Sequence, residues 1–255
     1  MNGHLPKIVM ITGATGGFGE AFAHKFAEAG CKLILTSRKP DRLDALVKAC
    51  KVAAHTIILD VRDRKAIETA FAGIPKEFAE IDTLINNAGG AFGQEPAWES
   101  NLDDWENMIE ANNLGLVVCT RLALPAMVKR KKGHIINIGS VAGSYAYPAG
   151  HVYCGVKAFT KHFSQALRAD LISTGVRVTT IEPGMVETDF SLNRYHGDAK
   201  RAAKVYEGAD PMTAEDIADA VFWAATQPPR VNINRIELMP VTQASGPLAV
   251  YREKS

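Results

Sequence analysis

The stretch Thr12-Gly13-Ala14-Thr15-Gly16-Gly17-Phe18-Gly19 decides the fold of this chain. It follows an apolar run over residues 7–12 and precedes a segment in which Phe22, Phe26 and Ala29 recur at helical spacing. A chain that passes so tightly from strand to helix needs residues without a Cβ. The same lack of side chains lets backbone N–H groups approach a pyrophosphate. A glycine pattern alone also fits an ordinary tight turn, and the strand–helix context is what favours a dinucleotide site.

Outward from this turn, short β-rich runs alternate with helical segments. The runs are nearly continuously apolar and do not alternate with polar residues, which is typical of strands buried on both faces. The alternation predicts an α/β fold, a doubly wound parallel seven-stranded sheet in a single domain over residues 1–255. Strands are expected over residues 7–12, 32–36, 56–59, 83–85, 134–138, 176–181 and 233–238. Helices are expected up to a left-handed cap at Gly30, over residues 43–50, 102–131 and 153–173, and after a capping box over residues 213–216. In the long helix, Gly115 is expected to allow a bend or the close approach of a neighbour.

The composition argues against several classes of function. The 29 basic and 28 acidic residues give a net charge of +1, which disfavours a broad nucleic-acid or anionic-membrane surface. The basic run over residues 129–132 fits the carbonyl end of a helix. No stretch approaches the roughly 20 uninterrupted apolar residues of a membrane span, and the N-terminus has no export pattern. The four cysteines and seven histidines show no metal-site spacing. We therefore expect a soluble cytoplasmic protein with reduced thiols, no metal, and neither nucleic-acid nor membrane partners.

The end of the second strand distinguishes between NAD and NADP. An NAD site places an Asp or Glu there, about 20 residues beyond the glycine turn. Here the segment is Thr36-Ser37-Arg38-Lys39, which has no acid and two cations. A guanidinium can bind a 2′-phosphate through two parallel hydrogen bonds, whereas a carboxylate would repel it. The pattern favours NADP, with a solvated loop arginine as the alternative for Arg38. The nearby Asp41 is expected to start the second helix.

Candidate catalytic residues lie on two helices and one strand end. Tyr153 and Lys157 have i, i+4 spacing, which places them on one face of a helix, although such pairs also occur by chance. Ser140 follows the fifth strand at the carboxyl edge, where doubly wound folds bind ligands. Asn112 lies in the long helix near Gly115.

Taken together, these motifs resemble the short-chain dehydrogenase/reductase family along nearly the whole chain. Several motifs in the family's order are far more specific than any one of them. Val156 departs from the pattern, because relatives usually carry Ser or Thr there, and we expect this to affect packing more than chemistry. The matching stretches are residues 12–19, 86–89 and 112–115, Ser140, residues 153–157, and Pro183 with Gly184.

The resemblance implies a role for each catalytic candidate. Tyr153 would be the acid/base, Ser140 would hydrogen-bond the reacting oxygen, and Asn112 would hold a water that links Lys157 to solvent. A free tyrosine has a pKa near 10, and the Lys157 ammonium with the oxidised nicotinamide would lower it. Lys157 would also bond the nicotinamide ribose.

The resemblance also assigns residues to NADP. Asp60 and Val61 would contact the adenine, the segment from Asn87 to Gly89 the adenosine ribose, and Pro183 with Thr188 the nicotinamide side. The full expected set is Gly13, Thr15, Gly17, Phe18, Gly19, Arg38, Lys39, Asp60, Val61, Asn87, Ala88, Gly89, Tyr153, Lys157, Pro183, Gly184, Val186 and Thr188.

A closer resemblance points to the substrate. It rests on residues 112–113, 147–148, 151–153, 157–159, 181–184, 232–234 and 239–243. Members of the subgroup that shares these stretches oxidise 3-hydroxy acids such as serine, allo-threonine and 3-hydroxypropionate with NADP, and a sister set reduces sulfoacetaldehyde.

Both substrate classes are anions. A substrate-covering loop is expected over residues 185–211, with Arg194 as the anion clamp, because a fork of donors matches a planar carboxylate. An exposed loop arginine is the alternative. Ser140, Tyr147 and His151 are expected to bind the substrate, and for Tyr147 and His151 a place in the core or at the rim stays equally open.

The resemblance further implies a homotetramer in which the tail over residues 240–255 reaches a neighbouring subunit's pocket. Two rival functions remain. One is sulfoacetaldehyde reduction, which keeps the same fold, cofactor and catalytic residues. The other is a catalytically silent cofactor-binding protein. Such relatives usually lose a catalytic residue, whereas Ser140, Tyr153, Lys157 and Asn112 are all present here.

Overall fold

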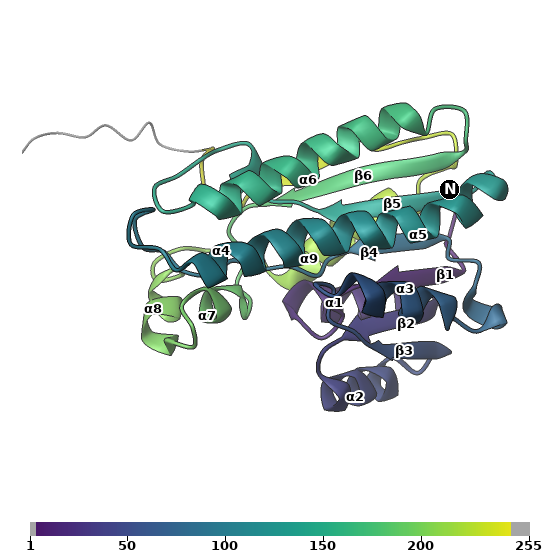
Figure 1. The fold of residues 1–255 in the computed structure, drawn as a ribbon, viewed down its shortest axis with the longest axis horizontal. Coiled ribbons are helices and arrows are strands. Elements are labelled where there is room, and N and C mark those ends of the chain that lie inside the picture. The colour runs from purple at the N-terminus through teal and green to yellow at the C-terminus, as the bar shows by residue number, and fades with distance from the viewer. Residues whose placement is uncertain (1–3, 246–255) are drawn as a thin grey trace, which may run out of the picture.

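A sheet of seven parallel strands lies at the centre of the structure, a computed structural model that describes residues 4–245 (Figure 1). The strand order is β3-β2-β1-β4-β5-β6-β7, so the chain winds outward twice from a switch point between β1 and β4. This confirms the predicted doubly wound fold. The strands are β1 (Ile8–Ile11), β2 (Lys32–Ser37), β3 (Ala54–Ile58), β4 (Thr83–Asn86), β5 (Gly133–Ile138), β6 (Val176–Pro183) and β7 (Arg235–Leu238).

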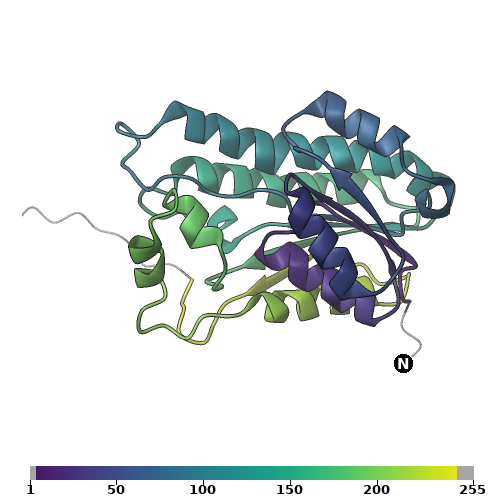
Figure 2. The same ribbon diagram turned by 90° about the horizontal axis from the view of Figure 1, so that it is seen from below.

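Helices cover both faces of the sheet (Figure 2). On one face lie α1 (Gly17–Glu28), α2 (Pro40–Cys50) and α9 (Ala214–Ala225). On the other lie α3 (Arg64–Ala72), α5 (Gly115–Lys129) and α6 (His151–Asp170). Successive residues of β1 alternate between the two cores, with Val9 in the first and Met10 in the second. Because each face has its own core, every residue of the strand is apolar.

The long predicted helix over residues 102–131 is three elements in succession. The helix α4 (Leu102–Ile109) passes through a π turn, η2 (Glu110–Leu114), into α5. Gly115 follows the turn, and a Cβ there would lie 2.7 Å from the Cβ of Val61. The expected close neighbour is therefore present at Gly115, and the regular helix is interrupted by the π turn just before it. By length and composition Leu102–Lys129 is apolar enough to span a membrane, but Cys119 and Met127 pack into the core, so α5 is a core helix of the domain.

Two regions differ from the sequence-based expectation. Helix α3 was not predicted, because among its residues only Ile67 is fully buried and the apolar stripe is thin. Residues 185–211 contain two short helices, α7 (Phe190–Arg194) and α8 (Ala199–Lys204), rather than only loop. The predicted capping box at Thr213 and the left-handed Gly30 are confirmed. The predicted tail is described only up to residue 245, and residues 246–255 lie outside the described part.

Candidate active site

The glycine turn lies at the switch point of the sheet, against the end of β4. Gly13 has a φ of +65°, and a Cβ there would lie 3.0 Å from the Cα of Ala88. The backbone N–H groups of Asn87 and Ala88 each donate to the Thr12 hydroxyl at 3.0 Å. The Asn87 amide donates to the carbonyls of Thr12 and Gly13. Three of the residues assigned to the cofactor are thus joined in one rigid unit.

The residues assigned to the adenosine end lie beside this turn. The side chains of Thr15 and Ser37 are hydrogen-bonded to each other. The side chain of Arg38 is 62% exposed, and its Nη1 lies 3.8 Å from Oδ2 of Asp60. Arg62 binds the same carboxylate more closely, with its Nη2 at 2.6 Å. The hydrogen bond from Arg62 holds the pKa of Asp60 below its usual value. Sequence analysis missed Arg62, which no motif marks.

The segment that follows β6 crosses the same edge of the sheet. A Cβ at Gly17 would lie 2.8 Å from the Cβ of Thr188, so this segment covers the glycine turn. The backbone N–H of Met185 donates to Oε1 of Gln243 at 2.7 Å, and Val186 forms an isolated parallel bridge with Met212. Gln243 is therefore a further residue that shapes this edge.

Tyr153 and Lys157 are both buried on α6. The Lys157 ammonium donates to the carbonyl of Ile138 at 3.0 Å and lies 5.7 Å from the centroid of the Tyr153 ring. Burial lowers the pKa of Lys157 to about 8, because the charged form loses solvation. Burial also raises the pKa of Tyr153, and the Ser140 hydroxyl and the Arg194 charge act against that shift.

Ser140 and Asn112 complete the predicted catalytic set. Ser140 caps a 3-10 turn, η3 (Val141–Gly143), by accepting a hydrogen bond from the Ala142 N–H at 3.1 Å. Asn112 lies in the π turn, and its amide donates to the carbonyls of Gly90 and Met108 at 2.9 and 2.8 Å. Among the described residues its buried Oδ1 has no hydrogen-bond partner. That oxygen can accept a hydrogen bond from water.

Arg194 is buried beside the acid/base candidate, with 8% of its surface exposed. Its Nη1 donates to the Tyr147 hydroxyl at 2.9 Å, and its Nε donates to the Gly93 carbonyl at 3.3 Å. The central guanidinium carbon lies 5.9 Å from the centroid of the Tyr153 ring. The alternative of an exposed loop arginine is therefore wrong.

His151 lies apart from this cluster. Its Nε2 lies 3.1 Å from the Ser100 hydroxyl and 3.2 Å from the Glu95 carbonyl, and its ring packs on Trp105. The described contacts of His151 reach α4 and the segment before it, and none of them joins it to Tyr153 or Arg194.

Residues next to Arg194 bind its segment to residues 93–94 and to α4. The Tyr195 hydroxyl donates to Oε1 of Gln94 at 2.6 Å, and His196 pairs with Asp104 at 3.1 Å. The backbone N–H of Gly93 donates to the Arg194 carbonyl at 3.0 Å. These contacts join segments about a hundred residues apart, and no local sequence signal reveals them.

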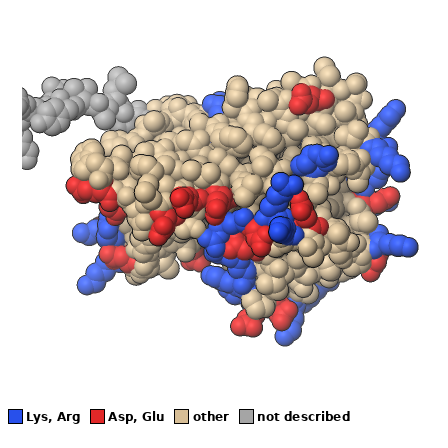
Figure 3. Space-filling model, viewed as in Figure 1, with Lys and Arg blue, Asp and Glu red and all other residues tan. Residues whose placement is uncertain are grey.

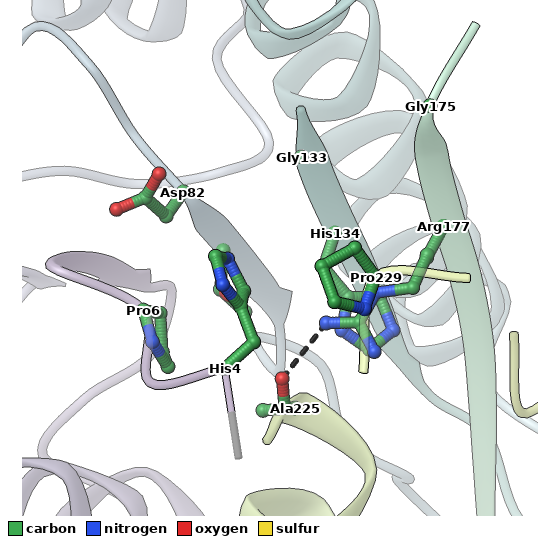
Figure 4. A pocket seen from close by; sticks show the side chains of 10 residues that line it. His4, Pro6, Asp82, Gly133, His134, Gly175, Arg177, Ala225 and Pro229 are labelled. Carbon is green, nitrogen blue, oxygen red and sulfur yellow. Dashed lines mark hydrogen bonds between the residues drawn. The ribbon is translucent and has the colours of Figure 1, made fainter. Parts of the chain in front are cut away.

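A small polar cavity of about 20 Å³ lies at the opposite edge of the sheet, where the strands begin (Figure 4). It is lined by His4, Asp82, His134 and Arg177, among others. Arg177 donates to the Ala225 carbonyl at 2.8 Å and so ties β6 to the end of α9. The cavity is about large enough for one water and is separate from the candidate active site. Among residues 4–245, no three His, Cys, Asp or Glu side chains gather as metal ligands.

A doubly wound sheet with a glycine turn at its switch point, and with a buried Tyr-Lys pair and a serine at the same carboxyl edge, defines a nucleotide-dependent dehydrogenase. Residues 7–198 match the family of short chain dehydrogenases, and the chain belongs to it. An NADP-dependent 3-hydroxy acid dehydrogenase of Salmonella typhi is 52% identical over 246 residues, 96% of this chain and 99% of that protein. A serine 3-dehydrogenase of Agrobacterium fabrum is 47% identical over 245 residues, 96% of this chain and 98% of that protein.

Solved structures give the same result. A closed form of serine dehydrogenase complexed with NADP⁺ matches with a TM-score of 0.94 and 50% identity, covering 96% of this chain and 100% of that one. A serine dehydrogenase from Escherichia coli matches with a TM-score of 0.82 and 46% identity, over 93% and 99% of the two chains. The family resemblance and the fold expected from the sequence are both confirmed.

Proposed function

We propose that this dehydrogenase uses NADP to oxidise the hydroxyl of a small 3-hydroxy acid, of the serine, allo-threonine or 3-hydroxypropionate type, or to reduce the matching carbonyl. The observation that carries the proposal is the buried Arg194, whose guanidinium lies 5.9 Å from the Tyr153 ring. One small molecule can contact both groups. The names of the relatives, which are 3-hydroxy acid and serine dehydrogenases, support the same substrate class.

The residues present fit a dinucleotide that carries a 2′-phosphate. Helix α1 begins after Gly16, so no side chain caps its first N–H groups and they can bind a phosphate. No acid stands at the end of β2. Arg62 is occupied by Asp60, and we assign the 2′-phosphate to Arg38 and Lys39. When bound, the cofactor supplies or accepts the hydride.

The remaining cofactor contacts follow from position at the same edge. Asp60 and Val61 are assigned to the adenine, and the segment from Asn87 to Gly89 to the adenosine ribose. Pro183, Gly184, Val186 and Thr188 are assigned to the nicotinamide side. The contact between Gly17 and Thr188 supports this placement, because it brings the segment after β6 onto the glycine turn.

Tyr153 is the proposed acid/base. During oxidation its phenolate oxygen accepts the substrate's hydroxyl proton, and during reduction the phenol returns the proton. Burial alone favours the neutral phenol, so the phenolate depends on the nearby cations Lys157 and Arg194. The Ser140 hydroxyl donates to the reacting oxygen. The unpartnered Oδ1 of Asn112 supports a water that carries protons between Lys157 and solvent.

Arg194 is the proposed clamp for the substrate carboxylate, within a covering segment over residues 185–211. Tyr147 positions the guanidinium through its hydroxyl. Sulfoacetaldehyde reduction is the second candidate, and it uses the same cation. A tetrahedral sulfonate has three oxygens to satisfy, and all three guanidinium nitrogens of Arg194 already donate one hydrogen bond to protein oxygens. This favours the carboxylate.

The test is turnover with each substrate class. NADP reduction is followed at 340 nm with serine, allo-threonine and 3-hydroxypropionate, beside NADPH oxidation with sulfoacetaldehyde. Turnover dominated by the hydroxy acids supports the proposal, and turnover confined to sulfoacetaldehyde overturns the substrate class.

The Tyr153→Phe variant tests the acid/base. It should lose about 10²–10⁴-fold in kcat while it still binds NADPH. A variant that binds NADPH but keeps its turnover would remove Tyr153 as the acid/base.

We also propose a cytoplasmic homotetramer. The surface over α6 carries few charges (Figure 3), and Leu102, Ile109 and Phe159 are exposed on α4 and α6. These features support contact with a second copy. All four cysteines are free, which fits a reducing compartment. A monomer in light scattering would contradict the tetramer, and secretion of the intact chain would contradict the location.

A further inference from the structure

The segment over residues 140–147 carries candidate site residues at both of its ends. Ser140 begins it and Tyr147, the partner of Arg194, ends it. Two consecutive residues in between are each tied to a carboxylate. The Ser144 hydroxyl donates to Oε2 of Glu182 at 3.3 Å, and the Tyr145 hydroxyl donates to Oε1 of Glu237 at 3.1 Å.

The two carboxylates are neighbours in the sheet. Glu182 on β6 and Glu237 on β7 are register partners. The Glu182 side chain is fully buried and the Glu237 side chain is 23% exposed. Arg235 lies between them, with guanidinium nitrogens 3.6 Å from Glu182 and 3.7 Å from Glu237. Burying a carboxylate is unfavourable unless hydrogen bonds and charges compensate it. The burial of Glu182 therefore points to a role for this pair other than keeping the surface soluble.

The same network reaches the catalytic helix. The Lys161 ammonium donates to the Ser144 hydroxyl at 2.7 Å. Lys161 lies one turn after Lys157, on the same face of α6. Gly143 packs directly on Lys157, because a Cβ there would lie 2.7 Å from the Lys157 carbonyl. The segment is therefore held between the carboxylates on the sheet and the helix that carries Tyr153 and Lys157.

Glu182 also touches the residue before Ser140. A Cβ at Gly139 would lie 3.2 Å from Cγ of Glu182, and the Gly139 N–H donates to the Ile181 carbonyl at 2.7 Å. The strand that carries Glu182 thus supports Ser140 directly, while Ser144 and Tyr145 fix the segment beyond it.

We propose that Glu182 and Glu237 are positioning residues for the reaction. They hold residues 140–147 so that the Ser140 hydroxyl stays aimed at the reacting oxygen and the Tyr147 hydroxyl stays on Arg194. This inference rests on the proposed function, which gives Ser140 and Tyr147 their roles. A shift of about 1 Å in a reacting group can reduce turnover by about 10²-fold, so a loosened segment should lower kcat.

The test removes single hydrogen bonds from the network. Tyr145→Phe deletes only the hydroxyl that donates to Glu237. Glu237→Leu deletes the acceptor, whereas Glu237→Gln keeps an acceptor oxygen of nearly the same shape. We expect Tyr145→Phe and Glu237→Leu each to lower kcat by about tenfold with an unchanged Kd for NADPH. Glu237→Gln should restore most of the activity. The double variant Tyr145→Phe/Glu237→Leu should lose no more than Glu237→Leu alone, because the Tyr145–Glu237 hydrogen bond is already absent from that single variant.

The control is Glu68→Leu, which removes a carboxylate from an exposed ion pair with Arg64 on α3. It should keep wild-type kinetics. A merely structural role would lower the melting temperature of the network variants but leave kcat of the folded protein unchanged, and that result overturns the proposal. For Glu182, Ser144→Ala removes the hydroxyl that donates to it without disturbing the buried carboxylate itself, and it should also lower kcat with an unchanged Kd for NADPH. The proposed function fails separately, when the wild type does not turn over 3-hydroxy acids; the variants are then compared on whichever carbonyl substrate is active.

Discussion

Arg194 donates a 2.9 Å hydrogen bond to the hydroxyl of Tyr147, although the two residues are 47 positions apart in the sequence. The guanidinium also lies over the Tyr147 ring, 5.4 Å from its centroid. These contacts and the burial of Arg194 fix the cation before any substrate binds. A preorganised cation loses little side-chain entropy on binding, which raises affinity for an anion.

The first prediction concerns this cation. Arg194→Met keeps an apolar stem and removes the charge and all the donors. We expect KM for the 3-hydroxy acid to rise by about 10²-fold, since truncating a buried hydrogen-bonded charge partner costs about 2–5 kcal/mol. Initial rates against substrate concentration measure this, with the NADPH Kd expected to stay unchanged. Arg64→Met, at an exposed position on α3, is the matched control. An unchanged KM would remove Arg194 from the substrate site.

The second prediction concerns the 2′-phosphate. Arg38→Ala should weaken NADP binding by about tenfold at low salt and leave the weak binding of NAD unchanged. Because the Arg38 side chain is 62% exposed, the loss should shrink as salt is raised. Fluorescence titration with NADPH and NADH at two salt concentrations measures both effects. Equal losses for the two cofactors would show that Arg38 does not contact the 2′-phosphate.

The third prediction concerns the fastening of residues 194–196. Tyr195→Phe removes the hydroxyl that donates to Gln94. One such bond contributes about 0.5–1.5 kcal/mol, so we expect a two- to tenfold rise in the substrate KM with kcat unchanged. The variant Gln94→Ala should give a similar rise, and the double variant no further one. Additive effects would show that the two side chains do not act on the substrate site through their shared bond.

The strands and the glycine turn could be predicted from the sequence because their signals are local. The first strand is a continuous apolar run, since residues such as Val9 and Met10 face separate cores, and most of the other strands are rich in apolar residues. The turn is read from its own glycines. Helix α3 was not predicted, because it buries too few residues to show a helical period of apolar side chains.

The site was only partly predictable. Tyr153 and Lys157 share a helix face through i, i+4 spacing, whereas His151 lies two residues before Tyr153 and so points to a different side of the helix. Helix geometry therefore explains why His151 contacts Ser100 and Glu95 instead. Burial of Arg194 depends on Gly93 and Tyr147 from other parts of the chain, and a polar local sequence does not reveal it.

The last prediction concerns stability at low pH. His134 is buried on β5 and its Nε2 pairs with the Thr179 hydroxyl at 2.7 Å. Burial and the nearby Arg177 guanidinium hold the pKa of His134 well below its usual 6.5. His4, Asp82 and Arg177 share its cavity (Figure 4), and Lys132 pairs with Asp82. The folded state therefore keeps the imidazole neutral.

The direction in which the free energy of unfolding changes with pH follows from proton binding. Below pH 6.5 the unfolded chain takes up a proton at His134 that the folded chain does not. The free energy of unfolding should therefore be fully retained above pH 6.5 and fall as the pH drops below it, by at most about 1.4 kcal/mol per pH unit from this residue. Urea unfolding between pH 7.5 and 5 measures the slope. His134→Gln should flatten it, and His162→Gln, at an exposed position on α6, should not. Equal slopes in the wild type and His134→Gln would mean that other groups control the acid sensitivity.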